Sequence, residues 1–89
     1  MEKKTVLNGF AIVVADRGYV YVGNVELDDQ FAVVTDCRNI RRWGTTKGLG
    51  ELALSGPTGD TVLDDVGTVR IPLRAIISLI DTEAAKWNK

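Results

Sequence analysis

The chain has 89 residues, of which 45% are hydrophobic and 26% are charged, a composition that is typical of globular proteins and excludes an intrinsically disordered chain. The 11 basic and 12 acidic side chains give a net charge of -1, which argues against a broad basic surface for DNA or membranes and confines any anion binding to a local cluster. A chain of this length buries one core, so a single domain over residues 1–89 is expected.

The first two predicted strands form a hairpin. The apolar run from Phe10 to Ala15 is rich in β-formers and ends at a turn, Asp16-Arg17-Gly18, whose glycine tolerates positive φ. A second strand is predicted over residues 19–27, because apolar and aromatic side chains recur there at alternate positions, at Tyr19, Tyr21, Val25 and Leu27. Gly23 lies between them and is expected to form a β-bulge.

A third strand is predicted to open at residues 31–35, after a turn at residues 28–30, and to continue through Cys37, with the basic segment at its far end. In an unbroken strand Ile40 would lie among arginines, and neither face would be apolar. We therefore expect a bulge or bend between Asp36 and Ile40, which turns Ile40 toward the core and the arginines toward a common outer side.

A short helix and a loop are predicted next. Thr45 or Thr46 is expected to cap a helix that ends at Gly56-Pro57, because apolar residues recur at helical spacing, at Leu49, Leu52 and Ala53. The polar segment 57–67 is predicted to be a mobile loop, with at most a strand fragment at residues 61–63.

The last elements complete the predicted fold. Strands are expected at residues 69–71 and 75–80, separated at Pro72, and a helical turn at residues 83–87. The fold class is therefore mainly β (α+β), a small, strongly bent SH3-like β-barrel with one short inserted helix and a C-terminal helical turn. Closure of the barrel would hide most sheet edges.

Two residue counts exclude most catalytic chemistry. Histidine is absent, which rules out imidazole-based triads and His-containing zinc sites. Cys37 is the only cysteine, so an intramolecular disulfide and a thiolate cage are impossible, and a buried thiol is expected. The aspartates lie mostly at predicted turns. We therefore expect no enzyme, no metal and no cofactor, and a cytoplasmic protein, since the longest apolar run is too short for a signal peptide or membrane span.

The candidate site is a basic cluster beside an aromatic side chain. Four cations fall between Asp36 and Glu51 without an acid among them, and the segment comprises Arg38, Arg41, Arg42, Trp43, Thr45, Thr46 and Lys47. Arginine forks bind phosphate bidentately, an indole can stack on a base, and a helix start offers backbone donors. The pattern equally allows Trp43 to be a core or interface anchor, and the arginines to be solvated charges.

A resemblance adds to this interpretation. The segments that carry it are Asp16-Arg-Gly-Tyr-Val-Tyr-Val-Gly23, Cys37-Arg-Asn-Ile-Arg-Arg-Trp43, Gly48-Leu-Gly-Glu-Leu-Ala53 with Gly56, Ile76-Ile-Ser-Leu-Ile80 and Thr82-Glu-Ala-Ala85. In this order they resemble a family of small uncharacterised phage and prophage proteins with an Ala-Arg-Arg-Ile-Trp-x-Trp-type motif. Cys37, Asn39 and Arg41 depart from it, standing where the family has alanine, often a second arginine and often an aromatic residue. The resemblance implies a phage origin, a small fold and, by analogy with related sponges, capture of nucleotide signals of bacterial immunity.

Three functions follow as hypotheses. The first is a non-enzymatic phage accessory protein that self-associates and sequesters a phosphorylated, nucleotide-like small molecule between its subunits. The second is a structural or protein-interaction module of a phage. The third is single-stranded nucleic-acid binding, which suits a small barrel with aromatics but lacks a basic surface.

Overall fold

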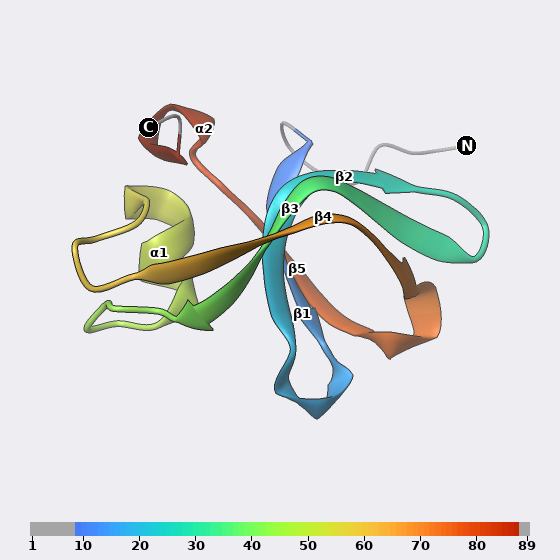
Figure 1. Ribbon diagram of the computed structural model, residues 1–89, viewed down its shortest axis with the longest axis horizontal. Helices are drawn as coiled ribbons and strands as arrows, with labels where there is room; N and C mark the ends of the chain where they lie inside the picture. The colour runs from blue at the N-terminus through green and yellow to red at the C-terminus, as the bar shows by residue number, and fades with distance from the viewer. Residues whose placement is uncertain (1–8, 88–89) are drawn as a thin grey trace.

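One antiparallel sheet of five strands forms the framework (Figure 1). The computed structural model describes residues 9–87. The strands are β1 (Phe10–Ala15), β2 (Val20–Leu27), β3 (Phe31–Arg42), β4 (Val62–Pro72) and β5 (Ile76–Asp81). Their order in the sheet is β4-β3-β2-β1-β5. The prediction of a mainly β protein with short helices is confirmed.

Local turn chemistry determines the two hairpins. Strands β1 and β2 are joined by the 3-10 turn η1 (Asp16–Gly18), in which Arg17 and Gly18 have φ values of 62° and 81°. Strands β2 and β3 are joined where the Asp28 carboxylate accepts hydrogen bonds from the backbone N–H groups of Gln30 (2.8 Å) and Phe31 (2.7 Å). Both turns lie where the sequence predicts them.

Two irregularities shape the centre of the sheet. The β2–β3 register shifts between Val22 and Asn24, and a Cβ on Gly23 would lie 2.7 Å from Cγ1 of Val34. Asp36 has φ 48°, and the β3–β4 register shifts on both sides of Cys37. The predicted bulge at Gly23 and the predicted bend after Asp36 are therefore confirmed.

Each face of the sheet buries its own apolar cluster. The first cluster contains Ala11, Val13, Ala15, Val25, Ala32, Val34, Cys37 and Ile71. The second cluster, on the other face, contains Ile12, Val20, Val22, Ile40, Leu52, Ala53 and Trp87. Alternation of side chains along β1 supplies both clusters, and the bend after Asp36 allows Cys37 to join the first while Ile40 joins the second.

Two helices cover the second cluster. Helix α1 (Leu49–Ser55) buries Leu52 and Ala53 and ends at Gly56, as predicted. Helix α2 (Ala84–Trp87) places the buried indole of Trp87 against the ring of Phe10, with centroids 5.7 Å apart. The carbonyl of Ala53 accepts hydrogen bonds from the backbone N–H of Glu83 (3.0 Å) and from Nε1 of Trp87 (3.1 Å). The end of α1 is thus tied to the C-terminal segment.

The sheet is not closed, so the predicted closed barrel is wrong. Within residues 9–87, strands β4 and β5 are the two edges and do not pair with each other. They are linked by the 3-10 turn η2 (Leu73–Ala75), and side chains of β4, η2 and β5 all pack on the first cluster. Apolar packing, and not a ladder of hydrogen bonds, therefore joins the two ends of the sheet.

The predicted mobile loop is also largely wrong. Residues 62–67 belong to strand β4, which pairs with β3 along most of its length. The segment looks loop-like in sequence because it is an edge strand with much of its surface exposed, so it carries Asp64, Asp65 and Gly67 in place of apolar residues.

Candidate functional site

The predicted basic cluster is divided between the two faces of the sheet. Asn39 lies opposite Asp64 on β4, and directly opposite residues share a face. Ile40, the next residue, is buried on the other face beneath α1. Arg41 reaches Asp64, with Nε to Oδ2 at 2.8 Å and Nη2 to Oδ1 at 3.4 Å. The expectation that the arginines point to a common outer side is therefore wrong.

Arg41 is not a free cation. Its guanidinium hydrogen-bonds the Asp64 carboxylate and holds the pKa of that carboxyl below its ordinary value. The acid that pairs with Arg41 is distant in sequence, since Asp64 lies 23 residues away and comes into reach only through the β3–β4 ladder. A phosphate at Arg41 would have to compete with this carboxylate.

The hydrogen-bond donors that precede α1 are already bound to a side chain of that helix. The Glu51 carboxylate accepts hydrogen bonds from the backbone N–H of Lys47 (2.8 Å) and from the hydroxyl of Thr46 (3.2 Å). The N-cap is Gly48, with φ 87° and no side-chain cap, whereas the Thr45 hydroxyl donates to the Gly48 carbonyl at 2.9 Å. The predicted threonine cap is wrong, since an acid in the first helical turn satisfies the donors that were assigned to a ligand.

Trp43 lies at the surface in a loop that two hydrogen bonds hold in place. Its side chain is 42% exposed, so it is not a core residue. Its backbone carbonyl accepts a hydrogen bond from the Thr61 hydroxyl at 2.7 Å, and the Gly44 carbonyl accepts one from Thr58 at 2.8 Å. The ring passes over the position that a Cβ of Gly48 would take, 3.8 Å from Cζ3. Arg42 and Lys47 are exposed, and no ion pair ties their side chains within the described part of the chain.

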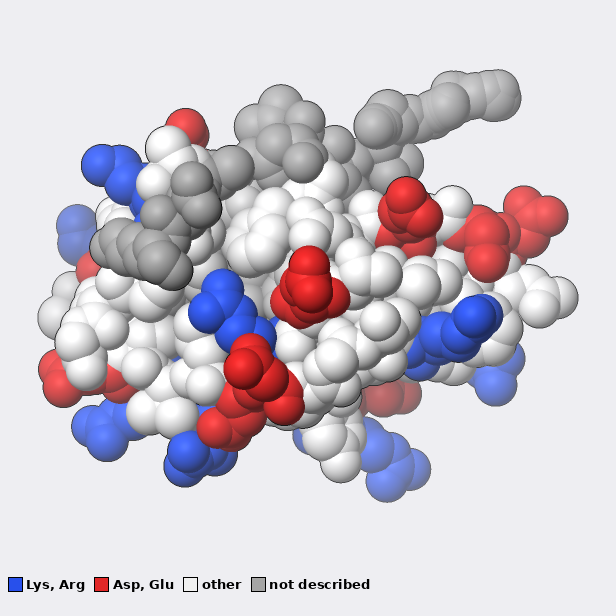
Figure 2. Space-filling view, turned by 45° about the horizontal axis from the view of Figure 1, so that its top comes forward, with Lys and Arg blue, Asp and Glu red and all other residues white. Residues whose placement is uncertain are grey.

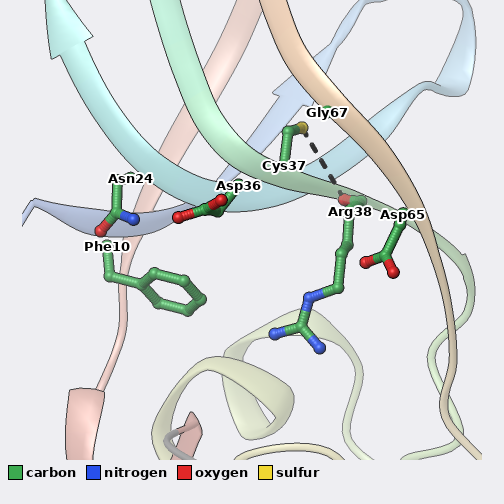
Figure 3. A pocket seen from close by; sticks show the side chains of 7 residues that line it. All are labelled: Phe10, Asn24, Asp36, Cys37, Arg38, Asp65 and Gly67. Atoms are coloured by element: carbon green, nitrogen blue, oxygen red, sulfur yellow. Dashed lines mark hydrogen bonds between the residues drawn. The ribbon is translucent and has the colours of Figure 1, made fainter.

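The remaining arginine lines a hollow that the sequence did not reveal (Figure 3). The hollow has a volume of about 500 Å³ and is lined by Phe10, Asn24, Asp36, Cys37, Arg38, Asp65 and Gly67. Figure 3 shows Asn24 and Asp36 beside the ring of Phe10, and Asp65 beside Arg38. The Arg38 guanidinium points to the side of the sheet where α1 lies, and the Cys37 thiol points the other way.

The hollow contains one arginine and two aspartates that do not pair with one another. Arg38 is half-buried, and among residues 9–87 its guanidinium has no hydrogen-bond or ion-pair partner, although Asp65 is its partner in the β3–β4 register. Asp36 and Asp65 expose two carboxylates at the same hollow. One cation and two anions suit a ligand that carries both an anionic group and hydrogen-bond donors, and disfavour a bare anion.

Some of the residues that line the hollow could have been identified from the sequence. Phe10 and Asn24 lie opposite each other in the β1–β2 ladder, so the predicted hairpin already implied their proximity. Asp36 is the bulge residue, and bulges often lie beside binding sites. Asp65 had no usable signal, since its segment was predicted to be a loop.

Cys37 lines the hollow and has a buried free thiol. Burial raises the pKa of the Cys37 thiol to about 11, so it stays protonated near neutral pH. Within residues 9–87 no group of three or more metal-ligating side chains comes together. Neither α1 nor α2 has the length and apolar composition that a membrane-crossing helix needs.

The charged side chains do not form one broad patch on the face shown in Figure 2, where basic and acidic groups are interspersed. This distribution agrees with the near-neutral composition of the chain. No family model, curated protein or solved structure matches the chain, so the geometry of the site stands on its own.

Proposed function

We propose that this protein is a non-enzymatic binding module that captures a small phosphorylated, nucleotide-like molecule in the hollow beside Arg38. The observation that supports the proposal is that Arg38 lines the hollow and that its guanidinium has no hydrogen-bond or ion-pair partner in the described residues. A guanidinium without a carboxylate partner has all its donors available for the anionic group of a ligand. The Arg41 guanidinium, the Thr46 hydroxyl and the backbone N–H of Lys47 are already bound to acids.

The lining of the hollow assigns a role to each part of such a ligand. The phosphate would bind Arg38, whose planar fork suits phosphate oxygens. The base would lie against the ring of Phe10, with Asn24 and the Asp36 carboxylate accepting hydrogen bonds from its N–H groups. The volume of about 500 Å³ falls within the range that ligand pockets have.

The biological setting of the proposal comes from the resemblance to phage and prophage proteins. A phage accessory protein that holds a nucleotide signal would act as a sponge in the host cytoplasm, and binding alone would suffice. Self-association belongs to the same proposal, because a second subunit could cover an open hollow that a chain of 89 residues encloses only on one side. The SH3-like comparison is likewise a proposal, supported by the strong bend of the sheet and by the 3-10 turn before its last strand.

Calorimetric titration of mononucleotides and cyclic dinucleotides tests the proposal. We expect one of them to bind, and Arg38→Ala to weaken that binding by about tenfold or more, because a charge-assisted hydrogen bond to phosphate is lost. Arg41→Ala is the matched control, since Arg41 lies on the other face, and it should leave the affinity unchanged. Asp36→Asn tests the base contact in a protein that keeps the bulge side chain.

Two results would overturn the proposal. One is the absence of binding by every nucleotide in a folded protein, and the other is equal affinity in the Arg38→Ala variant. Native mass spectrometry of protein purified from phage-infected cells adds a direct reading of stoichiometry and of any retained ligand.

A protein-interaction module is the second candidate. The observation that favours it is the exposure of apolar side chains, chiefly Ile77 (68%) on edge strand β5 and Leu54 (65%) on the outer surface of α1. Ile77→Lys should then abolish partner binding in a variant that remains folded. Single-stranded DNA binding, the third hypothesis, would weaken steeply as salt rises, whereas binding in a compact hollow would not.

A further inference from the structure

Two tyrosine rings lie side by side on the face of the sheet opposite to α1. Tyr19 and Tyr21 are two residues apart, so they project from the same face, and their ring centroids are 6.2 Å apart with planes only 5° from parallel. Tyr19 is 53% exposed and Tyr21 is half-buried against the first cluster. The two rings are therefore stacked, and the exposed Tyr19 ring presents aromatic surface to water.

Hydrogen-bonding groups flank this aromatic surface. Asn39 on β3 lies opposite Tyr21, and Asp64 on β4 lies opposite Asn39, so the three share a face. Arg41 is bound to Asp64 and adds a guanidinium to the same surface. Burial raises the pKa of the Tyr21 phenol, so its hydroxyl remains a neutral donor at physiological pH.

The surface carries no net charge. Arg41 is balanced by Asp64, with Nε and Oδ2 only 2.8 Å apart, and Asn39 and the two tyrosines are neutral. The adjoining turn η1 carries one charge of each sign, Asp16 and Arg17. A nucleic-acid strand brings one phosphate for each base and needs unpaired cations, which this surface does not offer. A neutral ligand matches its charge.

We infer that the surface formed by Tyr19, Tyr21, Asn39, Arg41 and Asp64 binds a neutral saccharide. A hexopyranose ring has one face of C–H groups, which stacks on an aromatic ring, and a rim of hydroxyls, which both donate and accept hydrogen bonds. The exposed ring of Tyr19, supported by the stacked Tyr21, provides the stacking surface, Asp64 and the Asn39 amide accept, and Arg41 and Asn39 donate. This surface lies on the opposite face from the Arg38 hollow and does not depend on it.

Saturation-transfer NMR with three neutral oligosaccharides, maltohexaose, cellohexaose and chitohexaose, tests the inference. At least one of them should receive saturation from the tyrosine ring protons. Tyr19→Ala should reduce its affinity about tenfold, whereas Tyr19→Phe should retain binding because the ring remains. Leu54→Ala is the matched control: it removes an equally exposed apolar side chain from α1, on the other face, and should bind as the native protein does.

Several outcomes would overturn the inference. They are the absence of transfer to all three saccharides, or binding that Tyr19→Ala leaves intact in a folded variant. Binding of an oligothymidylate that depends on Tyr19 and weakens steeply with salt, without saccharide binding, would assign the surface to single-stranded nucleic acid instead. Arg38→Ala should not change saccharide affinity, so this result is separate from the test of the hollow.

Discussion

Acidic side chains act at the residue scale mainly as local hydrogen-bond acceptors. Asp28 accepts two backbone N–H groups at the β2–β3 turn, and Glu51 accepts two donors at the start of α1. All four bonds span five residues or fewer, so the chain organises these turns without help from distant segments. Their strength depends on the carboxylate being ionised.

The Asp28 turn predicts a pH dependence of stability. Hydrogen bonds from the backbone of Gln30, and then of Phe31, lower the pKa of Asp28 below its ordinary value of 3.8. A lowered pKa in the folded state contributes stability that is present above the ordinary value and is lost as pH falls through the folded value. Urea unfolding from about pH 5 to about pH 2 should therefore lose less stability in Asp28→Asn than in the native protein. Identical slopes for the two proteins would contradict this.

Cys37 gives a second prediction at this scale. Burial raises the pKa of its thiol to about 11, so about one molecule in a thousand carries a thiolate at pH 8. A disulfide reagent such as 5,5'-dithiobis-(2-nitrobenzoate) should react with native protein about a hundredfold more slowly than with protein unfolded in guanidinium chloride. Comparable rates in both states would show that the thiol is accessible.

Glycine positions decide how closely β2 and β3 approach at the scale of elements. A Cβ on Gly23 would lie 2.7 Å from Cγ1 of Val34 and 2.9 Å from the Thr35 carbonyl, so the bulge depends on the missing side chain. Gly50 in α1 has the opposite status, because no atom lies within 4 Å of its would-be Cβ and its φ is not positive. One glycine is required by packing, and the other weakens its helix.

Alanine substitutions at these two glycines should have opposite effects. Gly23→Ala should destabilise the fold by about 1–3 kcal/mol through overpacking. Gly50→Ala should stabilise it by about 0.5–1 kcal/mol, because alanine restricts the unfolded chain and suits a helix. Chemical denaturation of both variants measures the difference, and effects of the same sign would contradict the assigned roles.

Features that depend on neighbouring residues could be predicted from the sequence, whereas features that depend on the pairing of distant segments could not. The turn at Asp28, the bulge at Gly23 and the burial of Ile40 follow from neighbours in the chain, and all three were predicted. The pairing of Arg41 with Asp64 depends on the β3–β4 ladder, and the hollow at Arg38 depends on β1, β2, β3 and β4 together. Arginines that are close together in the sequence were therefore predicted to form one cluster, but side chains alternate along the strand and place them on different faces of the sheet.

The second apolar cluster is held together at the scale of the whole molecule by the C-terminal segment. Trp87 is buried, contacts Phe10 at the start of β1 and donates to the Ala53 carbonyl at the end of α1. Gly56, with φ 82°, lets the chain pass close to the backbone of Lys86. Elements from the beginning, middle and end of the described chain therefore depend on one side chain.

Removal of this side chain should be the most damaging single change. Trp87→Ala should lower the free energy of unfolding by about 3–5 kcal/mol, since it leaves a cavity and removes the hydrogen bond to the Ala53 carbonyl of α1. Leu54→Ala, which truncates an exposed leucine on α1, should have a free energy of unfolding within about 0.5 kcal/mol of that of the native protein. Equilibrium urea denaturation measures both, and similar midpoints for the two variants would show that Trp87 is dispensable.

The double acceptor at Ala53 has a consequence for the order in which the chain folds during synthesis. The carbonyl is made early but receives its donors from Glu83 and Trp87, 30 and 34 residues later. Strand β1 likewise waits for β5, its second neighbour in the sheet. A ribosome adds about 5–20 residues per second, so a nascent chain carries an unfinished α1 and an exposed β1 edge until its last strand has left the exit tunnel. Folding of this protein is therefore completed only after synthesis of residue 87.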